Sequence, residues 1–204
     1  DQRLSSFKFP IDPKLFLNFK KTKDFLNEID FLKFRGFLGQ CRLVTNGPKY
    51  DNQSNQPIIL KNIIGYHNGI VLDFTQENFI EGINNENDTK KLFSSLNEKI
   101  NNKQSTEQYL NSLNGTISIS YINNLNNSIN LYTNNGSIYY FLDKEKKILV
   151  YASEKFILFN LLKKDLKIKS FEIKKLQNDK LLSYFLDSLE NVEENFLTIS
   201  KTLK

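Results

Sequence analysis

The pattern of apolar and polar positions predicts a helix near the N-terminus. Apolar residues recur at near-helical intervals over residues 13–33. Asp12 is suited to cap the first turn, and Pro13 suits the first helical position because proline has no N–H to leave unpaired there. Gly36 and Gly39 follow and favour an end to the helix.

Short runs rich in β-branched and apolar residues come next and predict strands. The stretch "QCRLVT" at 40–45 predicts the first, and the polar residues 46–57 predict a surface loop after it. Two further apolar runs, at 58–66 and 70–74, predict two more strands. The Asn-Gly pair between them, Asn68-Gly69, is typical of a type I′ hairpin turn.

Helical periodicity returns in the middle of the chain. Apolar residues after Asp88 lie on one helical face, with Asp88 as the expected N-cap, and Ser105 is suited to cap a second, shorter helix running to Leu113. Four short strands are then predicted in "GTISISYI", "SINLYT", "SIYYFL" and "KKILVYA", joined by turns rich in Asn and Gly. We interpret these four as an antiparallel meander.

The remaining chain predicts a helix in "SEKFILFNLLKK" and an extended segment or strand pair in "DLKIKSFEI". Acidic clusters alternate with Leu and Phe from about residue 178 onward. We expect residues 1–177 to form one domain and residues 178–204 to be a helical tail, or the start of a linker or second domain. Strands, two helices and more antiparallel strands predict an α+β protein.

Composition narrows the range of functions. No stretch of the 204 residues approaches the roughly 18 apolar residues of a membrane helix, so we expect neither a membrane span nor a membrane partner. The net charge of +5 comes almost entirely from lysine, and the chain has only three arginines, whereas contacts with bases and phosphates rely strongly on arginine. We therefore expect no nucleic-acid partner.

Cysteine and methionine usage adds two observations. A single cysteine permits no internal disulfide and no cysteine-based zinc site, which fits a reducing cytoplasm. The chain contains no methionine and opens on Asp1. A processed protein, a cut chain or a sequence holding part of a gene product would each account for this.

Six features in order resemble the glutamine amidotransferase domain of class II, the N-terminal-nucleophile type of glucosamine-6-phosphate synthase and asparagine synthetase. They are "GFLGQCRLVTNG", a polar loop ending "NQPI", "IIGYHNGIVLDF", "NDTKKLF", "LNGTISISYI" and "ILVYASEKFILFNLL". The resemblance covers about residues 35–162. It implies a sandwich of two antiparallel sheets with helices on the outside.

The resemblance also implies roles for individual residues. Asn68 and Gly69 match the pair that stabilises the oxyanion formed when the side-chain amide of glutamine is attacked. Arg42 matches the arginine that binds the α-carboxylate of glutamine, and Asp88 matches the acid that holds its α-ammonium group. The turn that lines the glutamine pocket corresponds to Thr45 and Gly47, although family members often have histidine where this chain has Asn46.

Each of these residues also has a purely structural interpretation. Asn68-Gly69 alone would be read as a turn, Asp88 as an N-cap, and Arg42 as one half of a structural ion pair. His67, the only histidine, is expected to be a packed or turn residue rather than a catalytic base.

One departure from the family pattern concerns the nucleophile. The family uses an N-terminal cysteine whose own α-amine activates the thiol, but this sequence starts with Asp1, and no "Cys-Gly-Ile" segment precedes "GQCRL". The nucleophile segment could lie outside this sequence, it could have been lost while the fold was kept, or the resemblance could be false. A relocated nucleophile would have to be Cys41, paired with His67.

The resemblance thus implies a domain that hydrolyses glutamine to glutamate and ammonia. The ammonia would pass to an acceptor domain or partner protein, with a sugar or an asparagine-synthetase-like acceptor, and the chemistry needs no cofactor or metal. The alternative is a catalytically inactive binding or assembly module with the same fold. The sequence does not identify the acceptor or the oligomeric state.

Overall fold

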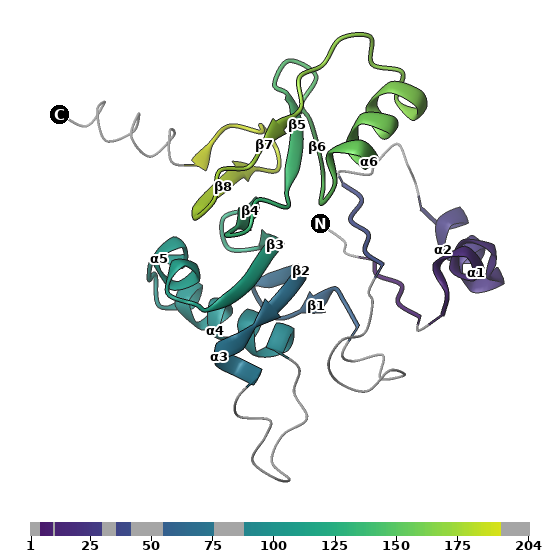
Figure 1. The fold of residues 1–204 in the computed structure, drawn as a ribbon. Coiled ribbons are helices and arrows are strands. Elements are labelled where there is room, and N and C mark those ends of the chain that lie inside the picture. Colours follow the sequence, from purple (N-terminus) through teal and green to yellow (C-terminus); the bar gives the residue numbers. More distant parts are fainter. Residues whose placement is uncertain (1–4, 10, 30–35, 42–54, 76–87, 193–204) are drawn as a thin grey trace.

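A computed structural model describes residues 5–9, 11–29, 36–41, 55–75 and 88–192 of the chain (Figure 1). It contains two antiparallel sheets. The first has five strands in the order β1-β2-β3-β4-β8, and the second has three in the order β6-β5-β7. The bounds of the first sheet's strands are Ile58–Ile59 (β1), Ile63–Val71 (β2), Gly115–Asn123 (β3), Ser128–Thr133 (β4) and Lys180–Phe185 (β8). Those of the second are Tyr139–Asp143 (β5), Ile148–Ala152 (β6) and Lys174–Lys175 (β7).

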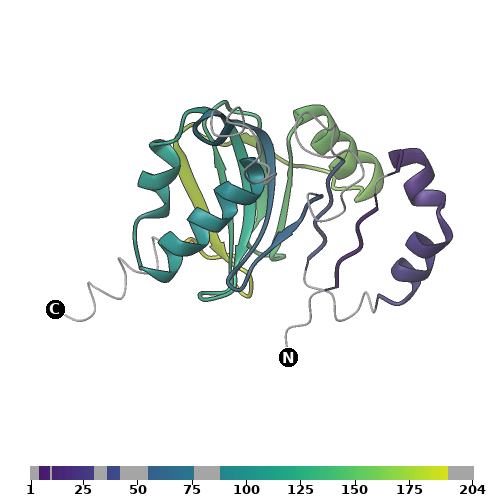
Figure 2. The same ribbon diagram turned by 90° about the horizontal axis from the view of Figure 1, so that it is seen from below.

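Helices lie outside both sheets. Next to the five-stranded sheet are α3 (Leu72–Thr75), α4 (Asp88–Asn101) and α5 (Thr106–Asn111). Against the three-stranded sheet lies α6 (Lys155–Asn160), which continues as one π-helical turn, η2 (Leu161–Asp165). Two short helices, α1 (Pro13–Asn18) and α2 (Lys20–Asn27), precede the sheets in the chain. Figure 2 shows the layers from α4 and α5 through the sheets to α6.

The layers are held together by three apolar clusters. The first fills the space between α4, α5 and the five-stranded sheet, with Leu92, Phe93 and Leu96 of α4 fully buried. The second lies between the two sheets and includes Leu131 of β4 and Ile138 beside β5. The third joins the outer face of β5 and β6 to the α6 and η2 segment. Alternate residues of each strand face opposite layers. The prediction of an α+β sandwich with outer helices is confirmed.

Several helix predictions are confirmed locally. The carboxylate of Asp12 accepts a hydrogen bond from the Lys14 N–H at 2.8 Å, and the Ser105 hydroxyl accepts one from the Gln108 N–H at 3.3 Å, so both residues are N-caps. The N-terminal helix is not continuous, because Phe19 takes an extended conformation and separates α1 from α2.

The prediction of a hairpin turn at Asn68-Gly69 is wrong. Strand β2 runs through both residues, and β3 pairs with it in register at nine successive positions, including Asn68 with Ser118 and Gly69 with Ile117. A complete ladder satisfies more backbone groups than a turn at this point would. The reversal occurs earlier, between β1 and β2. The strand expected at 70–74 begins as the last two residues of β2 and then gives way to helix α3.

The predicted meander of four strands is also wrong, although all four strands exist. Strands β3 and β4 pair in one sheet and β5 and β6 in the other. The chain crosses between the sheets after Thr133, where the Asn134 side chain accepts the Ile117 N–H at 2.7 Å. The apolar residues of both pairs therefore face each other across the second cluster.

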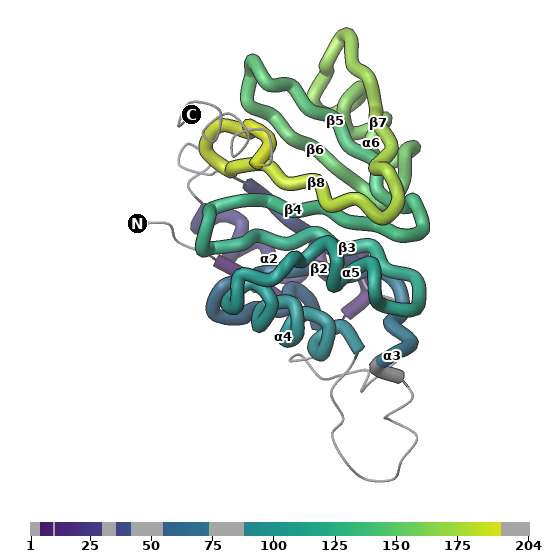
Figure 3. The backbone as a smooth tube through the Cα atoms, turned by 90° about the vertical axis from the view of Figure 1, so that its left-hand side faces the viewer, coloured from purple at the N-terminus to yellow at the C-terminus, as the bar shows by residue number. Residues whose placement is uncertain are grey.

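The helix expected from residue 178 is replaced by strand β8 at Lys180–Phe185 (Figure 3). It pairs with β4 at six positions. Leu182 and Tyr184 of β8 pack into the cluster between the sheets. Strand β4, with which β8 pairs, lies about 50 residues earlier in the chain, so the local periodicity of β8 does not reveal the pairing. The alternative, that residues 178–204 begin a linker or second domain, stays a prediction, because residues 193–204 lie outside the described part.

Candidate functional site

Strand β2 presents two faces of different character at the site. Its odd-numbered residues face α4: a Cβ at Gly65 would overlap the Phe93 ring, and His67 contacts Thr89. Its even-numbered residues face the space between the two sheets. Tyr66 and Asn68 lie on this second face, beside a small cavity.

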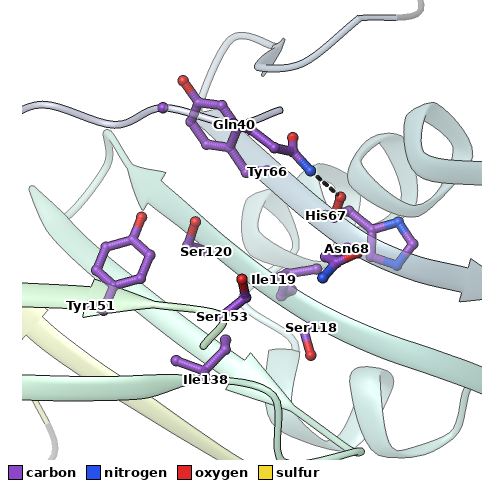
Figure 4. A pocket seen from close by; sticks show the side chains of 11 residues that line it. Gln40, Tyr66, His67, Asn68, Ser118, Ile119, Ser120, Ile138, Tyr151 and Ser153 are labelled. Atoms are coloured by element: carbon purple, nitrogen blue, oxygen red, sulfur yellow. Dashed lines mark hydrogen bonds between the residues drawn. The ribbon is translucent and has the colours of Figure 1, made fainter. Parts of the chain in front are cut away.

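The cavity lies where β2 and β3 pass the end of β6 (Figure 4). Its volume is about 100 Å³. A water molecule needs roughly 10–15 Å³ by this measure, so the cavity has room for several water-sized groups. It is lined by Gly39, Gln40, Tyr66, His67, Asn68, Ser118, Ile119, Ser120, Ile138, Tyr151 and Ser153.

Most of the described lining residues have polar side chains, but the surface that they expose to the cavity is more apolar than polar, and none of them is Lys, Arg, Asp or Glu. Burial raises the pKa of the Tyr66 and Tyr151 hydroxyls from 10.0 to about 12, so both stay protonated at neutral pH. Tyr66 donates a hydrogen bond to the Leu38 carbonyl at 3.1 Å. The described lining of the cavity thus consists of uncharged groups, several of which can form hydrogen bonds.

Asn68 lines the cavity, and Gly69 is the next residue along β2. Figure 4 shows the Asn68 amide on the Ser118 side of β2 and the His67 ring on the opposite side. Gly69 has a φ of +136°, a conformation that side-chain-bearing residues rarely adopt. A Cβ there would overlap the Thr116 carbonyl of the neighbouring strand. Only glycine fits the position, and it stands beside an amide that faces the cavity.

His67 is a buried, packed residue, which is one of the two structural roles expected for it. Its Nδ1 lies 2.9 Å from the Thr89 hydroxyl, and its Nε2 has no hydrogen-bond partner of standard geometry among the described residues. Burial lowers the pKa of His67 below its usual 6.5, and the nearby Asp88 carboxylate and the Thr116 backbone oppose this shift. A pair between Cys41 and His67 is not present, because Cys41 is exposed and both ring nitrogens of His67 lack a thiol contact.

Asp88 is the first residue of α4 rather than the residue before it. Its side chain is buried, and Oδ2 accepts the Val71 N–H at 3.0 Å. This bond joins the start of α4 to the end of β2, two residues beyond Gly69. Asp88 is not among the residues that line the cavity. Its predicted contact with an α-ammonium group stays a prediction.

Two glutamine side chains hold β2 at His67, the residue before Asn68. The Gln56 amide accepts the His67 N–H at 2.6 Å and donates to the His67 carbonyl at 2.8 Å. Gln40 donates to the same carbonyl at 2.9 Å. The Gln56 amide thus takes the place of a neighbouring strand's peptide group.

The sequence analysis missed these anchors and most of the cavity lining. Gln40 lies in a segment predicted to be a strand and Gln56 in one predicted to be a loop. Only their hydrogen bonds to His67 in the folded chain show that they hold β2. Ser118, Ser120 and Tyr151 lie within strands that the sequence predicted, whereas Ser153 opens the segment that was predicted to be a helix. The alternation of serine and isoleucine in "TISIS" is the one available signal, since it places hydroxyls on one face.

Three of the predicted glutamine contacts, Arg42, Thr45 and Gly47, lie outside the described residues, as does most of the strand expected at 40–45. Within the described ranges, no group of His, Cys, Asp and Glu is arranged to hold a metal ion. No helix in the same ranges is long and apolar enough to cross a bilayer.

Comparisons with known proteins identify no family. Neither a scan against protein-family models nor a search among curated proteins finds a match. A search of solved structures finds the glutamine phosphoribosylpyrophosphate amidotransferase from B. subtilis, complexed with ADP and GMP, at 14% identity and a TM-score of 0.48. The match covers 69% of this chain and 32% of that chain. Similarity this low does not assign a function.

Proposed function

We propose that this chain is a glutamine amidotransferase domain that hydrolyses glutamine to glutamate and ammonia for transfer to an acceptor. The observation that supports this most directly is the placement of Asn68 and Gly69. The Asn68 amide faces the cavity between the sheets, and Gly69 beside it occupies a conformation that only glycine fits.

This pair suits the chemistry of amide hydrolysis. Attack on the glutamine side chain converts its carbonyl oxygen into an oxyanion, and donors already in position stabilise that charge. The Asn68 side-chain N–H and the Gly69 backbone N–H would serve as these donors. The absence of a Cβ at Gly69 leaves the backbone open to close approach.

The rest of the glutamine molecule would be held by the residues that the resemblance identifies. Arg42 would bind the α-carboxylate through its planar guanidinium, and Asp88 would bind the α-ammonium group. Thr45 and Gly47 would line the pocket around them. We propose these four contacts on the sequence resemblance alone.

Hydrolysis by this mechanism needs a cysteine with a free α-amine next to the thiol. The only cysteine between Asp1 and Lys204 is the exposed Cys41, preceded by Gln40. We therefore propose that the nucleophile belongs to a segment outside this sequence. The chain spans about a third of the solved amidotransferase that it matches, and the ammonia acceptor, whether a sugar or an asparagine-synthetase-like site, would lie on another domain or partner.

The alternative is a binding or assembly module of the same fold without catalysis. The observation in its favour is the lack of any cysteine other than Cys41. Glutamine binding without ammonia release, measured on the protein produced from its complete gene, would favour this module over the enzyme.

The Asn68→Ala variant tests the proposed function. Removing one oxyanion donor should lower kcat for ammonia release about 100- to 1,000-fold, because the donor acts mainly on the transition state. The dissociation constant for glutamine should change much less. Ammonia release and calorimetric binding measure the two quantities.

Two further variants complete this test. Asn102→Ala, at an exposed position after α4, is the control and should match the wild type. Arg42→Ala should weaken glutamine binding about 10-fold or more, through the loss of a charged hydrogen bond. Equal losses of binding and turnover in Asn68→Ala would contradict the oxyanion role and favour a structural one.

A further inference from the structure

The segment formed by α6 and η2 lies on the outer side of the three-stranded sheet (Figure 2). Its inner face holds Leu158 and Leu162, which are fully buried in the third apolar cluster beside residues of β5 and β6. Its outer face leaves Phe156 73% exposed and Ile157 54% exposed. Phe159, 38% exposed, is three residues from Phe156 and so lies next to it on the helix. We call Phe156, Ile157 and Phe159 the α6 patch.

The α6 patch is more than a scatter of exposed apolar residues. Single exposed apolar residues are normal in soluble proteins, whereas groups of them rimmed by polar residues mark contact sites. Here the rim includes Lys163, whose ammonium group lies over the Phe159 ring at 5.3 Å. The helix also ends in the π-helical turn η2, and such turns are frequent at functional sites. These features indicate a contact surface.

Positive charge gathers in the same part of the chain. From Tyr139, where β5 begins, to Lys175, where β7 ends, the sequence has ten lysines and five acidic residues. This excess equals the net charge of +5 for all 204 residues, so the rest of the chain is balanced. All ten lysines are exposed. A surface with this charge attracts partners of the opposite sign.

Three of these lysines are close to the α6 patch in the helical segment. Lys155 directly precedes Phe156, and Lys163 and Lys164 follow about two turns later. None of the ion pairs between described residues includes any of the three. Their charges are therefore available to carboxylates of another molecule.

We propose that the outer face of α6 and η2 is a docking surface for another protein, and that this partner presents an acidic segment with apolar side chains. The apolar side chains would cover Phe156 and Ile157, and the carboxylates would pair with Lys163 and Lys164. Burial of the patch supplies affinity, while the charges speed association and fix the orientation. The inference does not depend on glutamine hydrolysis.

Three other occupants match these observations less well. In a symmetric contact with a second copy, the lysines of the two copies would face one another. An anionic lipid surface would repel Glu154 and Asp165, which are exposed at the two ends of the segment. Nucleic-acid contacts rely strongly on arginine, and the sequence has none between Tyr139 and Lys175. A protein partner can match charges of both signs.

Photo-crosslinking in the cells that produce the protein tests the inference. A benzophenone amino acid replaces Phe156 in the complete protein, and mass spectrometry identifies the cross-linked peptide. We expect the peptide to belong to a different protein and to carry acidic residues beside apolar ones. Leu125, an exposed apolar residue in the turn between β3 and β4, is the matched control position and should not capture this peptide.

A synthetic copy of the captured peptide then measures the docking by fluorescence anisotropy. Lys163→Glu combined with Lys164→Glu should weaken binding about 10-fold or more, because like charges then face one another. Phe156→Gln should weaken binding to a similar degree through the loss of apolar contact. The control pair Lys61→Glu and Lys103→Glu changes the net charge equally at exposed positions outside the surface. It should stay within about 2-fold of the wild type at physiological salt.

The other outcomes overturn the inference. Capture of a second copy, a lipid or a nucleic acid at Phe156 would assign the surface to that occupant instead. No capture, or capture of the same peptide at Leu125, would show that the α6 patch is not a specific contact. A captured peptide without acidic residues, or an affinity unchanged by the double charge reversal, would contradict the charge matching. Because the test reads binding to this surface alone, its result is independent of whether the protein hydrolyses glutamine.

Discussion

Adjacent residues on β2 have opposite surroundings because side chains alternate along a strand. Asn68 faces the cavity between the sheets, whereas His67 is 3% exposed and packed against α4. Within the described part of the chain, its Nε2 lacks a hydrogen-bond partner of standard geometry. Protonation would place a charge in this buried site, where the Asp88 carboxylate and the Thr116 backbone offset only part of the desolvation cost.

This environment predicts acid sensitivity. The pKa of His67 is lowered in the folded chain, so below about pH 6.5 the unfolded chain binds a proton that the folded chain does not. Stability is therefore fully present above that pH and falls as the pH decreases toward the folded-state pKa. Between pH 7.5 and 5.5 the free energy of unfolding should decrease by up to about 1.4 kcal/mol, as measured by urea denaturation.

The chain has a single histidine, which makes the control simple. The His67→Gln variant should lose the pH dependence in this window. An NMR titration of the His67 ring in the wild-type chain checks the cause independently of any variant. A measured pKa at or above 6.5 would contradict the prediction.

At the scale of the element, the two edges of β2 are paired differently: one is bonded along its whole length to a strand, and the other to a short strand and a side chain. β3 pairs with its whole length, while β1 pairs with it at only two positions. Beyond β1, the Gln56 amide bonds both the N–H and the carbonyl of His67. This arrangement holds the backbone one residue before Asn68.

We expect the Gln56→Leu variant to be less stable by about 1–3 kcal/mol, because the His67 N–H and carbonyl lose a partner at a partly buried position. Urea denaturation measures the loss. Hydrogen exchange at the His67 amide should quicken at the same time. Gln177→Leu, at an exposed position, is the control; a loss of the same size there would point to a general effect of added apolar surface.

At the scale of the whole molecule, four layers depend on pairings between distant segments. The five-stranded sheet ends with β8, which covers the edge of β4. Every residue of β4 is buried. The C-terminal part of the described chain is therefore part of the core and not an appendage.

Truncation tests this conclusion. A chain ending at Asn178 lacks β8 and would expose the edge of β4 and the cluster between the sheets, so we expect it to unfold or aggregate. A chain ending at Val192 keeps β8 and the bridge between Tyr184 and Asn191, and should melt near the temperature of the full chain. Circular dichroism and size-exclusion chromatography measure both. Cooperative melting of the shorter chain would show that β8 is dispensable.

The site could be predicted only in part. The resemblance drew attention to Asn68, Gly69 and Asp88 by their order in the sequence. The structure adds that Asn68 faces a cavity and that Asp88 bonds the Val71 N–H on the other side of the strand. The grouping of Tyr151, Ser120 and Ser153 around the cavity could not be predicted, because Ser120 lies on β3 and the other two lie at the end of β6, and these segments meet only in the folded chain.

What the sequence by itself determined is local: the caps at Asp12 and Ser105, the amphipathic face of α4, the four strands from Gly115 to Ala152, and the α+β class. These features depend on contacts between residues a few positions apart, which periodicity records directly. Only the tertiary structure decided that β2 continues through Asn68-Gly69, that the four strands divide between two sheets, and that Lys180–Phe185 is a strand. Those outcomes depend on the partner that each segment finds far along the chain, and a non-local partner can override local turn and helix preferences.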